Sequence, residues 1–507
     1  MNETQTATSR NSNVSTNGSL EAFFEPYRRN IVGFDQEFDT PFGNRPLVYA
    51  DWIASGRLYG PIEDAIRDRF GPFVGNTHSE SSVTGTSMTH AYHVAHGIIK
   101  RHVNAADDDV LLTTGTGMTG AVNKLHRILG LRVPDQAEQY VHLPAEKRPV
   151  VFCTHMEHHS NQTSWLETFA DLVCLEPDQR GLVDPERLKR ALERYGERER
   201  IIGAFTSCSN VTGIETPFRE LARIIHEAGG TVFVDFAASA PYVEIDMHPP
   251  DPLERLDGIY FSPHKFLGGP GSCGILLFNS SLYKSRVPDN PGGGTVNWTN
   301  PWGGRSYFDD IQIREDGGTP GFLQAIRAAL CIRLKDEMGV ERMLTREKEL
   351  LAIAWPALRS IPGIHILADQ VRDRLGIISF YSDKVHYNLM VRLLNDRYGI
   401  QVRGGCSCAG TYGHYLLHVD PSRSKAITDA IDHGDLSSKP GWVRFSLHPT
   451  MTDEEVRYVV EAIREVNEKS RGLAADYVYS PETNEYRHRD FNQAAEKAVI
   501  EGWFRMT

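Results

Sequence analysis

Short apolar runs alternate with segments of helical spacing through the middle of the chain. The runs are rich in β-branched and aromatic residues, which favour strands, and the clearest of them cover residues 110–113, 150–153, 172–175, 201–205 and 232–235. The intervening segments repeat apolar residues every three or four positions and predict helices at 121–129, 185–195 and 219–228. This alternation predicts an α/β domain with a mostly parallel sheet and a functional site at the strand ends.

The flanking segments predict a second, smaller domain and two extensions. Towards the N-terminus we expect a strand at 47–51, a helix at 61–70, a loop at 71–86 and a helix at 88–103. A Pro/Gly/Asn-rich stretch at 288–304 precedes a long helix from 323 to 338, and further strands are expected at 376–381, 400–403 and 442–447. The expected boundaries are a disordered tail (1–20), a large domain (21–340), a small C-terminal domain (341–471) and a C-terminal extension of unassigned role (472–507).

Composition narrows the class of protein. A chain of 507 residues with 40% hydrophobic and 24% charged residues is typical of a soluble protein with two or three domains. The net charge of -12 argues against nucleic acid or an anionic membrane as the main partner, so Arg372 and Arg374 are expected on a solvated surface. The sequence contains no apolar run long enough for a transmembrane helix, and the first 20 residues lack signal-peptide features. Seven scattered cysteines are typical of a reducing compartment, and together these features indicate a cytoplasmic enzyme.

The sharpest chemical signal is a pair of residues at two predicted strand ends. One apolar run ends at Asp235, and about 30 residues later another ends in Ser-Pro-His-Lys, with Lys265 as its last residue. A Gly-rich segment, 268–274, follows and lets the backbone approach a ligand closely. A lysine that forms a Schiff base and a carboxylate that pairs with a pyridinium nitrogen are what pyridoxal phosphate (PLP) requires. A surface lysine after a strand is the plain alternative.

Two further turns could complete such a site. The Gly115–Thr119 turn precedes a helix, whose N-terminal N–H groups and Thr119 hydroxyl could bind a phosphate, although an ordinary βα turn has a similar composition. His158 follows a strand and could stack on a flat ring or move protons. A metal site at His158 and His159 is less favoured, because adjacent side chains point apart and no third ligand is evident.

A cysteine-bearing loop follows the predicted strand at 400–403. It reads Arg403-Gly-Gly-Cys-Ser-Cys408, and a loop thiol near a cation is a candidate nucleophile. A structural cysteine pair and half of a metal site are the alternatives. Cys153 and Cys174 lie within apolar strands and are expected in the core.

No metal site is predicted elsewhere. The expected helix at 88–103 carries four histidines, at positions 90, 93, 96 and 102. Residues three apart on a helix drift by about 60° at each step, so three of these side chains cannot converge tightly on one ion.

In combination these motifs resemble the class V aminotransferase family of fold-type-I PLP enzymes, most closely the cysteine desulfurase and selenocysteine lyase branch. The resemblance covers about residues 49–462 and rests on the sequences T-G-M-T-G-A-V-N, M-E-H-H-S-N, S-N-V-T-G, V-D-F-A-A-S-A, S-P-H-K-F-L-G-G-P-G-S and V-R-G-G-C-S-C-A. It implies a large α/β domain with a mixed sheet, a smaller α+β domain, and a homodimer formed across the active site.

The resemblance also implies roles for individual residues. Lys265 would hold PLP through a Schiff base, Asp235 would pair with the pyridinium nitrogen, and His158 would stack on the ring. Asn210 would lie near the PLP oxygen or the substrate, and Arg444 would bind the substrate α-carboxylate. The remaining cofactor-binding positions would be Gly117, Met118, Thr119, Ser262 and His264, with Thr319 reaching the phosphate of the neighbouring subunit.

Cys408 falls where the desulfurases place the cysteine that forms a persulfide. The implied reaction converts L-cysteine to L-alanine and leaves the sulfur on Cys408 for an acceptor protein. Two departures from the family pattern leave other outcomes open: Ala238 stands where a Gln or His is usual, and the loop lacks the usual His before its Cys. Transamination, β-elimination or epimerisation of another amino acid, and a non-catalytic scaffold, are the alternatives; Ser239 or a water could replace the hydrogen bond lost at Ala238.

Overall fold

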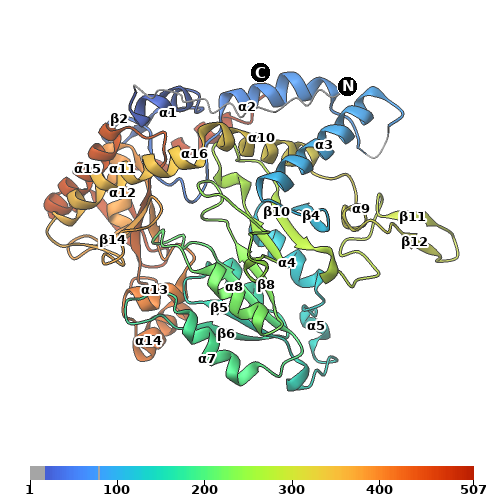
Figure 1. Ribbon diagram of the computed structural model, residues 1–507. Helices are drawn as coiled ribbons and strands as arrows, with labels where there is room; N and C mark the ends of the chain where they lie inside the picture. Colours follow the sequence, from blue (N-terminus) through green and yellow to red (C-terminus); the bar gives the residue numbers. More distant parts are fainter. Residues whose placement is uncertain (1–17, 78–79, 507) are drawn as a thin grey trace, which may run out of the picture.

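A seven-stranded sheet forms the centre of the computed structural model, which describes residues 18–77 and 80–506 (Figure 1). Its strand order is β4-β10-β9-β8-β7-β5-β6, and only β10 runs antiparallel to its neighbours. The strands are β4 (Asp109–Thr114), β5 (Val150–Thr154), β6 (Asp171–Leu175), β7 (Ile201–Thr206), β8 (Thr231–Asp235), β9 (Gly258–Phe261) and β10 (Gly274–Asn279). The predicted α/β fold with a mostly parallel mixed sheet is confirmed.

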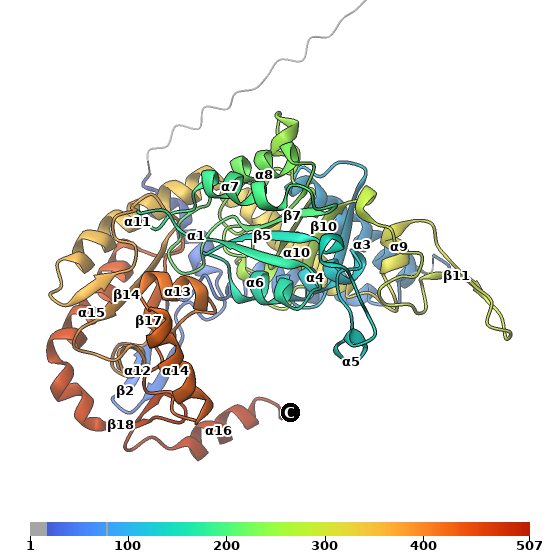
Figure 2. The ribbon, with the colours of Figure 1, turned by 90° about the horizontal axis from the view of Figure 1, so that it is seen from below.

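Helices cover both faces of this sheet. The side chains of successive strand residues point to opposite faces, so they pack in two separate cores. Val151 and Phe233 pack with α4 (Met118–Ile128) and α6 (His159–Leu166). The alternate residues, such as Phe152 and Val234, pack on the opposite face with α8 (Phe218–Glu227), α7 (Pro185–Tyr195) and α10 (Phe322–Met338). Figure 2 shows α7 and α8 on one side of the sheet and α4 and α6 on the other. Burial on both faces explains why these strands read as continuous apolar runs.

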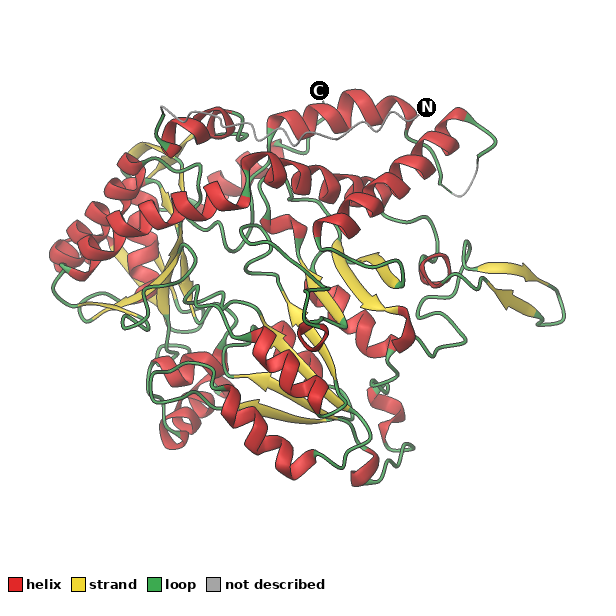
Figure 3. Ribbon diagram, in the orientation of Figure 1, coloured by secondary structure: helices red, strands yellow, loops and turns green. Residues whose placement is uncertain are grey.

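A second, antiparallel sheet is built from the C-terminal part of the chain, with the order β13-β14-β17-β16. Its strands are β13 (Ile364–Ile366), β14 (Ile377–Ser382), β16 (Arg403–Gly405) and β17 (Trp442–Ser446), and they lie with α11 (Val340–Arg359), α12 (Tyr387–Tyr398) and α15 (Asp453–Leu473) (Figure 3). The N-terminal segment joins this part, because β3 (Val48–Tyr49) pairs in parallel with β15 (Ile400–Gln401). The domain boundaries themselves stay a prediction.

Several element ends differ from the sequence expectation because of caps and long-range contacts. Helix α3 (Val83–His102) begins within the expected 71–86 loop, since the Ser82 hydroxyl accepts a hydrogen bond from Gly85 N. Helix α4 begins at Met118 and not at 121, because the Ser262 hydroxyl, far along the chain, receives the Met118 N–H. The expected helix at 61–70 is α2 (Gly60–Asp64) followed by a π-helical turn.

The remaining elements extend these two layers. The 288–304 stretch contains the first strand and the turn of a hairpin, β11 (Val296–Thr299) and β12 (Arg305–Tyr307), that projects from the molecule in Figure 2. The C-terminal extension contains β18 (Tyr477–Ser480), β19 (Glu485–His488) and α16 (Gln493–Gly502). Shorter elements are α1 (Leu20–Arg29), β1 (Glu37–Thr40), β2 (Gly43–Pro46), α5 (Asp135–Glu138), α9 (Ile311–Glu315), α13 (Gly410–Leu416) and α14 (Pro421–Asp432). Residues 1–17 of the expected N-terminal tail lie outside the described residues.

Two expectations about burial are wrong. Cys174 is only half-buried, because β6 is the edge strand of the central sheet, whereas Cys153 on β5 is in the core as expected. Arg374 is buried and not solvated: its guanidinium stacks over Trp355 at 4.6 Å and donates to the carbonyls of Thr212 (3.0 Å) and Leu367 (3.3 Å), among others. None of the helices within 18–77 and 80–506 is long and apolar enough to cross a membrane.

Replacement of Arg374 by Ala should lower the free energy of unfolding by about 3 kcal/mol, because several buried carbonyls lose a charged donor at once. Urea unfolding of the two variants provides the measurement. The exposed neighbour Arg372 is the matched control, and Arg372→Ala should change stability by less than about 0.5 kcal/mol. Equal effects of the two substitutions would contradict the structural role given to Arg374.

Candidate active site

A cavity of about 190 Å³ lies where the carboxyl ends of the central strands face the four-stranded sheet. It gathers every predicted site residue except Gly117 and Thr319. Its lining comprises Ile53, Ala54, Met118, Thr119, His158, Ser160, Thr206, Cys208, Asn210, Asp235, Ala237, Ala238, Ser262, His264, Lys265, Arg403, Ser407, Cys408 and Arg444. Residues that are more than 300 positions apart in the sequence therefore meet in one site.

Lys265 and Asp235 reach the cavity from neighbouring strands. Asp235 ends β8 and accepts a hydrogen bond from Ala237 N at 2.8 Å, while Lys265 ends a 3₁₀ turn that directly follows β9. Burial lowers the pKa of the Lys265 amine to about 8, although Asp235 opposes the shift, and burial raises the pKa of the Asp235 carboxyl to about 6. The amine is therefore far more often neutral than an ordinary lysine, which suits a nucleophile.

The Gly115–Thr119 turn and the Ser262–Lys265 turn form one anchored cradle. Met118 N donates to Ser262 Oγ at 2.8 Å, and His264 Nδ1 donates to Thr116 O at 3.0 Å. Gly117 lies within this cradle, where the two turns approach so closely that a Cβ would come within 2.9 Å of the His264 ring. The cradle thus presents the N-terminus of α4, the Thr119 hydroxyl and the His264 ring to the cavity, a donor set that suits a phosphate.

His158 caps helix α6 and faces the cavity. Its Nδ1 accepts a hydrogen bond from Ser160 N at 3.1 Å, and burial, with Lys265 as a further cause, lowers the pKa of its imidazole to about 3. A neutral imidazole can stack on a ring without adding charge. Glu157, which the sequence did not indicate, lies fully buried behind it and accepts from Thr206 N at 3.0 Å, which ties this segment to β7.

Arg444 is held by partners that leave part of its guanidinium free. One terminal nitrogen donates to Asp51 Oδ1 at 2.8 Å and the other to Asn210 O at 3.2 Å. Its Nε and the Asn210 Oδ1 are buried without a hydrogen-bond partner among the described residues. Buried polar atoms of this kind normally have a hydrogen-bond partner, and a ligand bound in the cavity would supply one. Asp51 was missed by the sequence analysis, where it only marked the end of a strand.

The two loop cysteines face different surroundings. Cys408 lines the cavity, whereas Cys406 is partly buried against the hydrophobic core and interacts with Tyr387 of α12. The cavity therefore selects Cys408 as the thiol that a bound substrate would meet.

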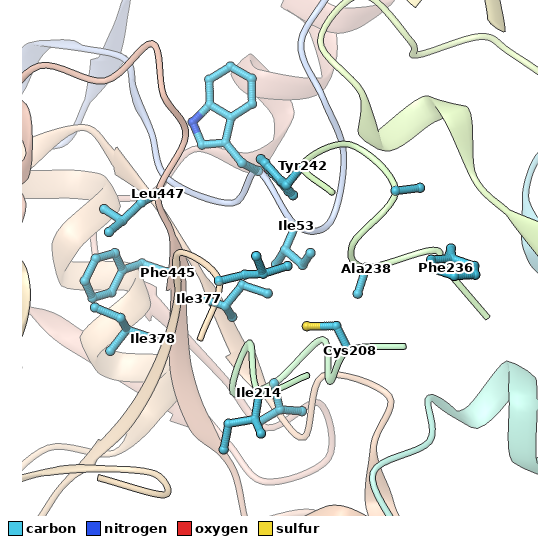
Figure 4. Packing of buried hydrophobic residues seen from close by; sticks show 14 of the residues in the cluster. Ile53, Cys208, Ile214, Phe236, Ala238, Tyr242, Ile377, Ile378, Phe445 and Leu447 are labelled. Carbon is cyan, nitrogen blue, oxygen red and sulfur yellow. The ribbon is translucent and has the colours of Figure 1, made fainter. Parts of the chain in front are cut away.

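Ala238 leaves an apolar wall where the family usually places a polar side chain. Figure 4 shows Ala238 and Cys208 next to Ile53 at the edge of the buried core. Ser239, a possible substitute, is fully buried with its hydroxyl 2.6 Å from that of Ser207, and it does not line the cavity.

The residues present fit PLP, because a nucleophilic amine, a buried carboxylate, a flat imidazole and an anion cradle converge on one cavity. Fold and cavity together define a PLP-dependent α/β enzyme. Residues 48–459 match the family model Aminotransferase class-V, and the chain belongs to that family. The predicted family and its cofactor, PLP, are confirmed at this level.

Named relatives are cysteine desulfurases. A "Probable cysteine desulfurase" of Halalkalibacterium halodurans is 28% identical over 376 residues, covering 73% of this chain and 86% of the relative. A cysteine desulfurase of Haloferax volcanii is 26% identical over 404 residues, covering 76% and 89%. The apo structure of a cysteine desulfurase from Thermococcus onnurineus superposes with a TM-score of 0.70 at 21% identity, covering 88% of this chain and 98% of that one. The structure of a cysteine desulfurase from Escherichia coli superposes with a TM-score of 0.65 at 23% identity, covering 83% of this chain and 94% of that one.

The rate of PLP uptake by the apoprotein should rise as the pH increases through about 8. Only the neutral Lys265 amine attacks, and with its pKa lowered to about 8 the neutral fraction at pH 7.5 is roughly a quarter, against about one in a thousand for an ordinary lysine. Appearance of a borohydride-reducible chromophore measures the rate. Lys265→Ala should form none, and a rate that is flat between pH 6.5 and 9.5 would contradict the shifted pKa.

Proposed function

We propose that the protein is a PLP-dependent enzyme of the cysteine desulfurase type, which converts L-cysteine to L-alanine and collects the sulfur as a persulfide on Cys408. The observation that carries this proposal is the position of Cys408 in the same cavity as Lys265 and Arg444, while Cys406 packs elsewhere. The names of the relatives support the same reaction.

Bound PLP would supply the electron sink that labilises the bonds around the substrate Cα. Arg444 offers its unpartnered Nε to the substrate carboxylate, and Asp51 fixes the orientation of the guanidinium. Asp235 would pair with the ring nitrogen of bound PLP, and neutral His158 would cover the ring. The cradle of Gly117, Met118, Thr119, Ser262 and His264 would hold the phosphate.

Lys265 and Cys408 act on the substrate. The Lys265 amine takes the Cα proton, because burial keeps a large fraction of it neutral near pH 8. The Cys408 thiolate forms an S–S bond with the substrate sulfur as the Cβ–S bond breaks. The electron pair of that bond is protonated on carbon, so alanine leaves and Cys408 keeps the persulfide.

Cys408→Ala should reduce sulfide release from L-cysteine, measured under reductant, by at least about a hundredfold, since the acceptor of the sulfur is lost. Binding of L-cysteine, followed by its change in the PLP absorbance, should persist. Cys406→Ala is the matched control and should retain activity within about twofold. Mass spectrometry should place the persulfide on Cys408 alone.

A second outcome within the family is favoured by Ala238, whose apolar side chain changes the polar surroundings of the cofactor. Transamination, β-elimination or epimerisation of another amino acid would then replace desulfuration. Full activity of Cys408→Ala, or conversion of PLP to its amine form by an amino donor, would establish this alternative. The scaffold alternative is disfavoured, because Lys265, Asp235 and His158 converge in the cavity.

The proposed enzyme is a cytoplasmic homodimer that acts on a small amino acid and passes sulfur to an acceptor protein. Thr319 supports the dimer, because it is exposed, donates to Asn76 Oδ1 at 3.1 Å and does not line the cavity of its own chain. In a dimer it would complete the phosphate site of the other subunit.

Thr319→Val should weaken PLP binding by roughly tenfold, the effect of one lost hydrogen bond to a charged group. Subunit mixing tests whether the threonine acts in trans. Mixed dimers of Thr319→Val and Lys265→Ala subunits should regain wild-type PLP affinity at one site, because the intact Lys265 then faces the intact Thr319. Mixed dimers without this recovery would rule out the arrangement.

A further inference from the structure

The loop that carries Cys408 has a strained backbone. Ser407 and Cys408 both have positive φ, at 50° and 57°, and Ala409 N donates to Cys406 O at 3.0 Å. Two consecutive positive φ values at the centre of such a turn are typical of type I′, which usually contains Asn or Gly at these positions. Side chains larger than Gly adopt this region reluctantly, so other contacts must hold the turn in place.

The holding contacts come from the first turn of helix α6 and from Asn210. His159 grips the loop on both sides of Ala409: its backbone N donates to Cys408 O at 2.7 Å, and its ring Nε2 accepts from Gly410 N at 2.8 Å. Asn210 Nδ2 donates to Ser407 O at 2.8 Å. Gly410 permits the close approach, because a Cβ there would lie 3.0 Å from His159 Nε2.

We infer that His159 is a positioning residue that latches the nucleophile loop, through its neutral ring nitrogen, onto the helix whose preceding residue faces the cofactor. The inference rests on the proposed function of Cys408 and adds the means by which its thiol is kept in the cavity. His158 and His159, adjacent in sequence, then serve the two reacting partners separately: His158 faces the cofactor, and His159 holds the loop of the sulfur acceptor.

The latch depends on the charge of His159. Nε2 accepts a hydrogen bond only while it carries no proton, and burial lowers the pKa of this imidazole below its usual value, with Lys439 as a second cause. The other titratable groups facing this junction are His158 on the same helix, the Cys408 thiol, and His414, whose Nδ1 donates to Gly410 O at 2.7 Å. Protonation of His159 Nε2 at acid pH would place its N–H against the N–H of Gly410. The hydrogen bond between them would then be lost.

The experiment compares His159→Leu, which has no ring acceptor, with His159→Gln, whose Oε1 can replace Nε2. In the PLP-loaded enzyme without substrate, iodoacetamide should alkylate Cys408 roughly threefold to tenfold faster in His159→Leu, the effect of one lost hydrogen bond. His159→Gln should stay within about twofold of the wild type. Peptide mass spectrometry separates Cys408 from Cys406, and the exposed His365 provides the control variant His365→Leu, which should not change the rate.

Two further measurements separate the latch from a general structural role. The Gly410 amide should gain in hydrogen-exchange rate from His159→Leu by a larger factor than the core amides of the central sheet, because a loss of overall stability would speed all of them. The alkylation rate of the wild type relative to that of His159→Gln should rise at pH values below the usual histidine pKa, because only the histidine loses its acceptor on protonation. Equal alkylation of Cys408 in the wild type and His159→Leu, or equal rates in the Leu and Gln variants, would overturn the inference.

The outcome is distinguishable from failure of the proposed function. Alkylation reports the position of the Cys408 loop whatever reaction the enzyme catalyses. Full desulfuration by Cys408→Ala would refute the proposed role of the thiol and leave the latch measurement intact. Unchanged alkylation together with an inactive Cys408→Ala would refute the latch alone.

Discussion

Desolvation of one amine at the edge of a parallel sheet is the constraint on which this site depends. The Lys265 amine lies where β9 ends, half-buried between the strand ends and the second sheet, and this partial desolvation lowers its pKa. Desolvation acts in the opposite sense on Asp235, whose carboxyl it makes less acidic. Without a ligand the two groups therefore sit closer in proton affinity than they would in water, which suits a site that must exchange protons with an incoming ring.

Enclosure of that amine requires both sheets, and Arg444 is the residue that joins them most directly. It lies on β17 and donates to Asp51, which follows β3, and to Asn210, which follows β7. Because both contacts use the terminal nitrogens, the Nε–H has no partner among the described residues, and Arg444 lines the cavity. The Arg444–Asp51 ion pair therefore mainly orients the guanidinium for binding. It adds little to stability, since a buried ion pair gives little net stabilisation.

The elements that depend on local pattern were predictable from the sequence, and those that depend on distant partners were not. The run ending at Asp235 and the turn ending at Lys265 were found because strand pattern and side-chain chemistry coincide there. Asp51 was missed because its partner Arg444 is 393 positions away. Arg374 was wrongly expected on the surface for a similar reason. Its buried guanidinium is satisfied by backbone carbonyls, and composition gives no sign of such partners.

The cysteine loop shows a further limit of pattern analysis. Its local pattern indicated a reactive thiol without separating Cys406 from Cys408, and only the family resemblance pointed to Cys408. In the structure Cys408 alone of the two lines the cavity, on a turn with positive φ angles at Ser407 and Cys408. Those angles are stabilised by His159, which the sequence offered only as a second histidine in a motif.

The pairing of β3 with β15 has a consequence for how the chain is made. The hydrogen bond from Arg45 to Arg397, beside that pairing, joins residues separated by 352 positions. At a translation rate of about 5–20 residues per second, the N-terminal segment waits roughly 20–70 s before its partner emerges from the ribosome. Throughout that interval β3 lacks the strand with which it pairs in the folded protein, so this pairing forms only after most of the chain has been synthesised.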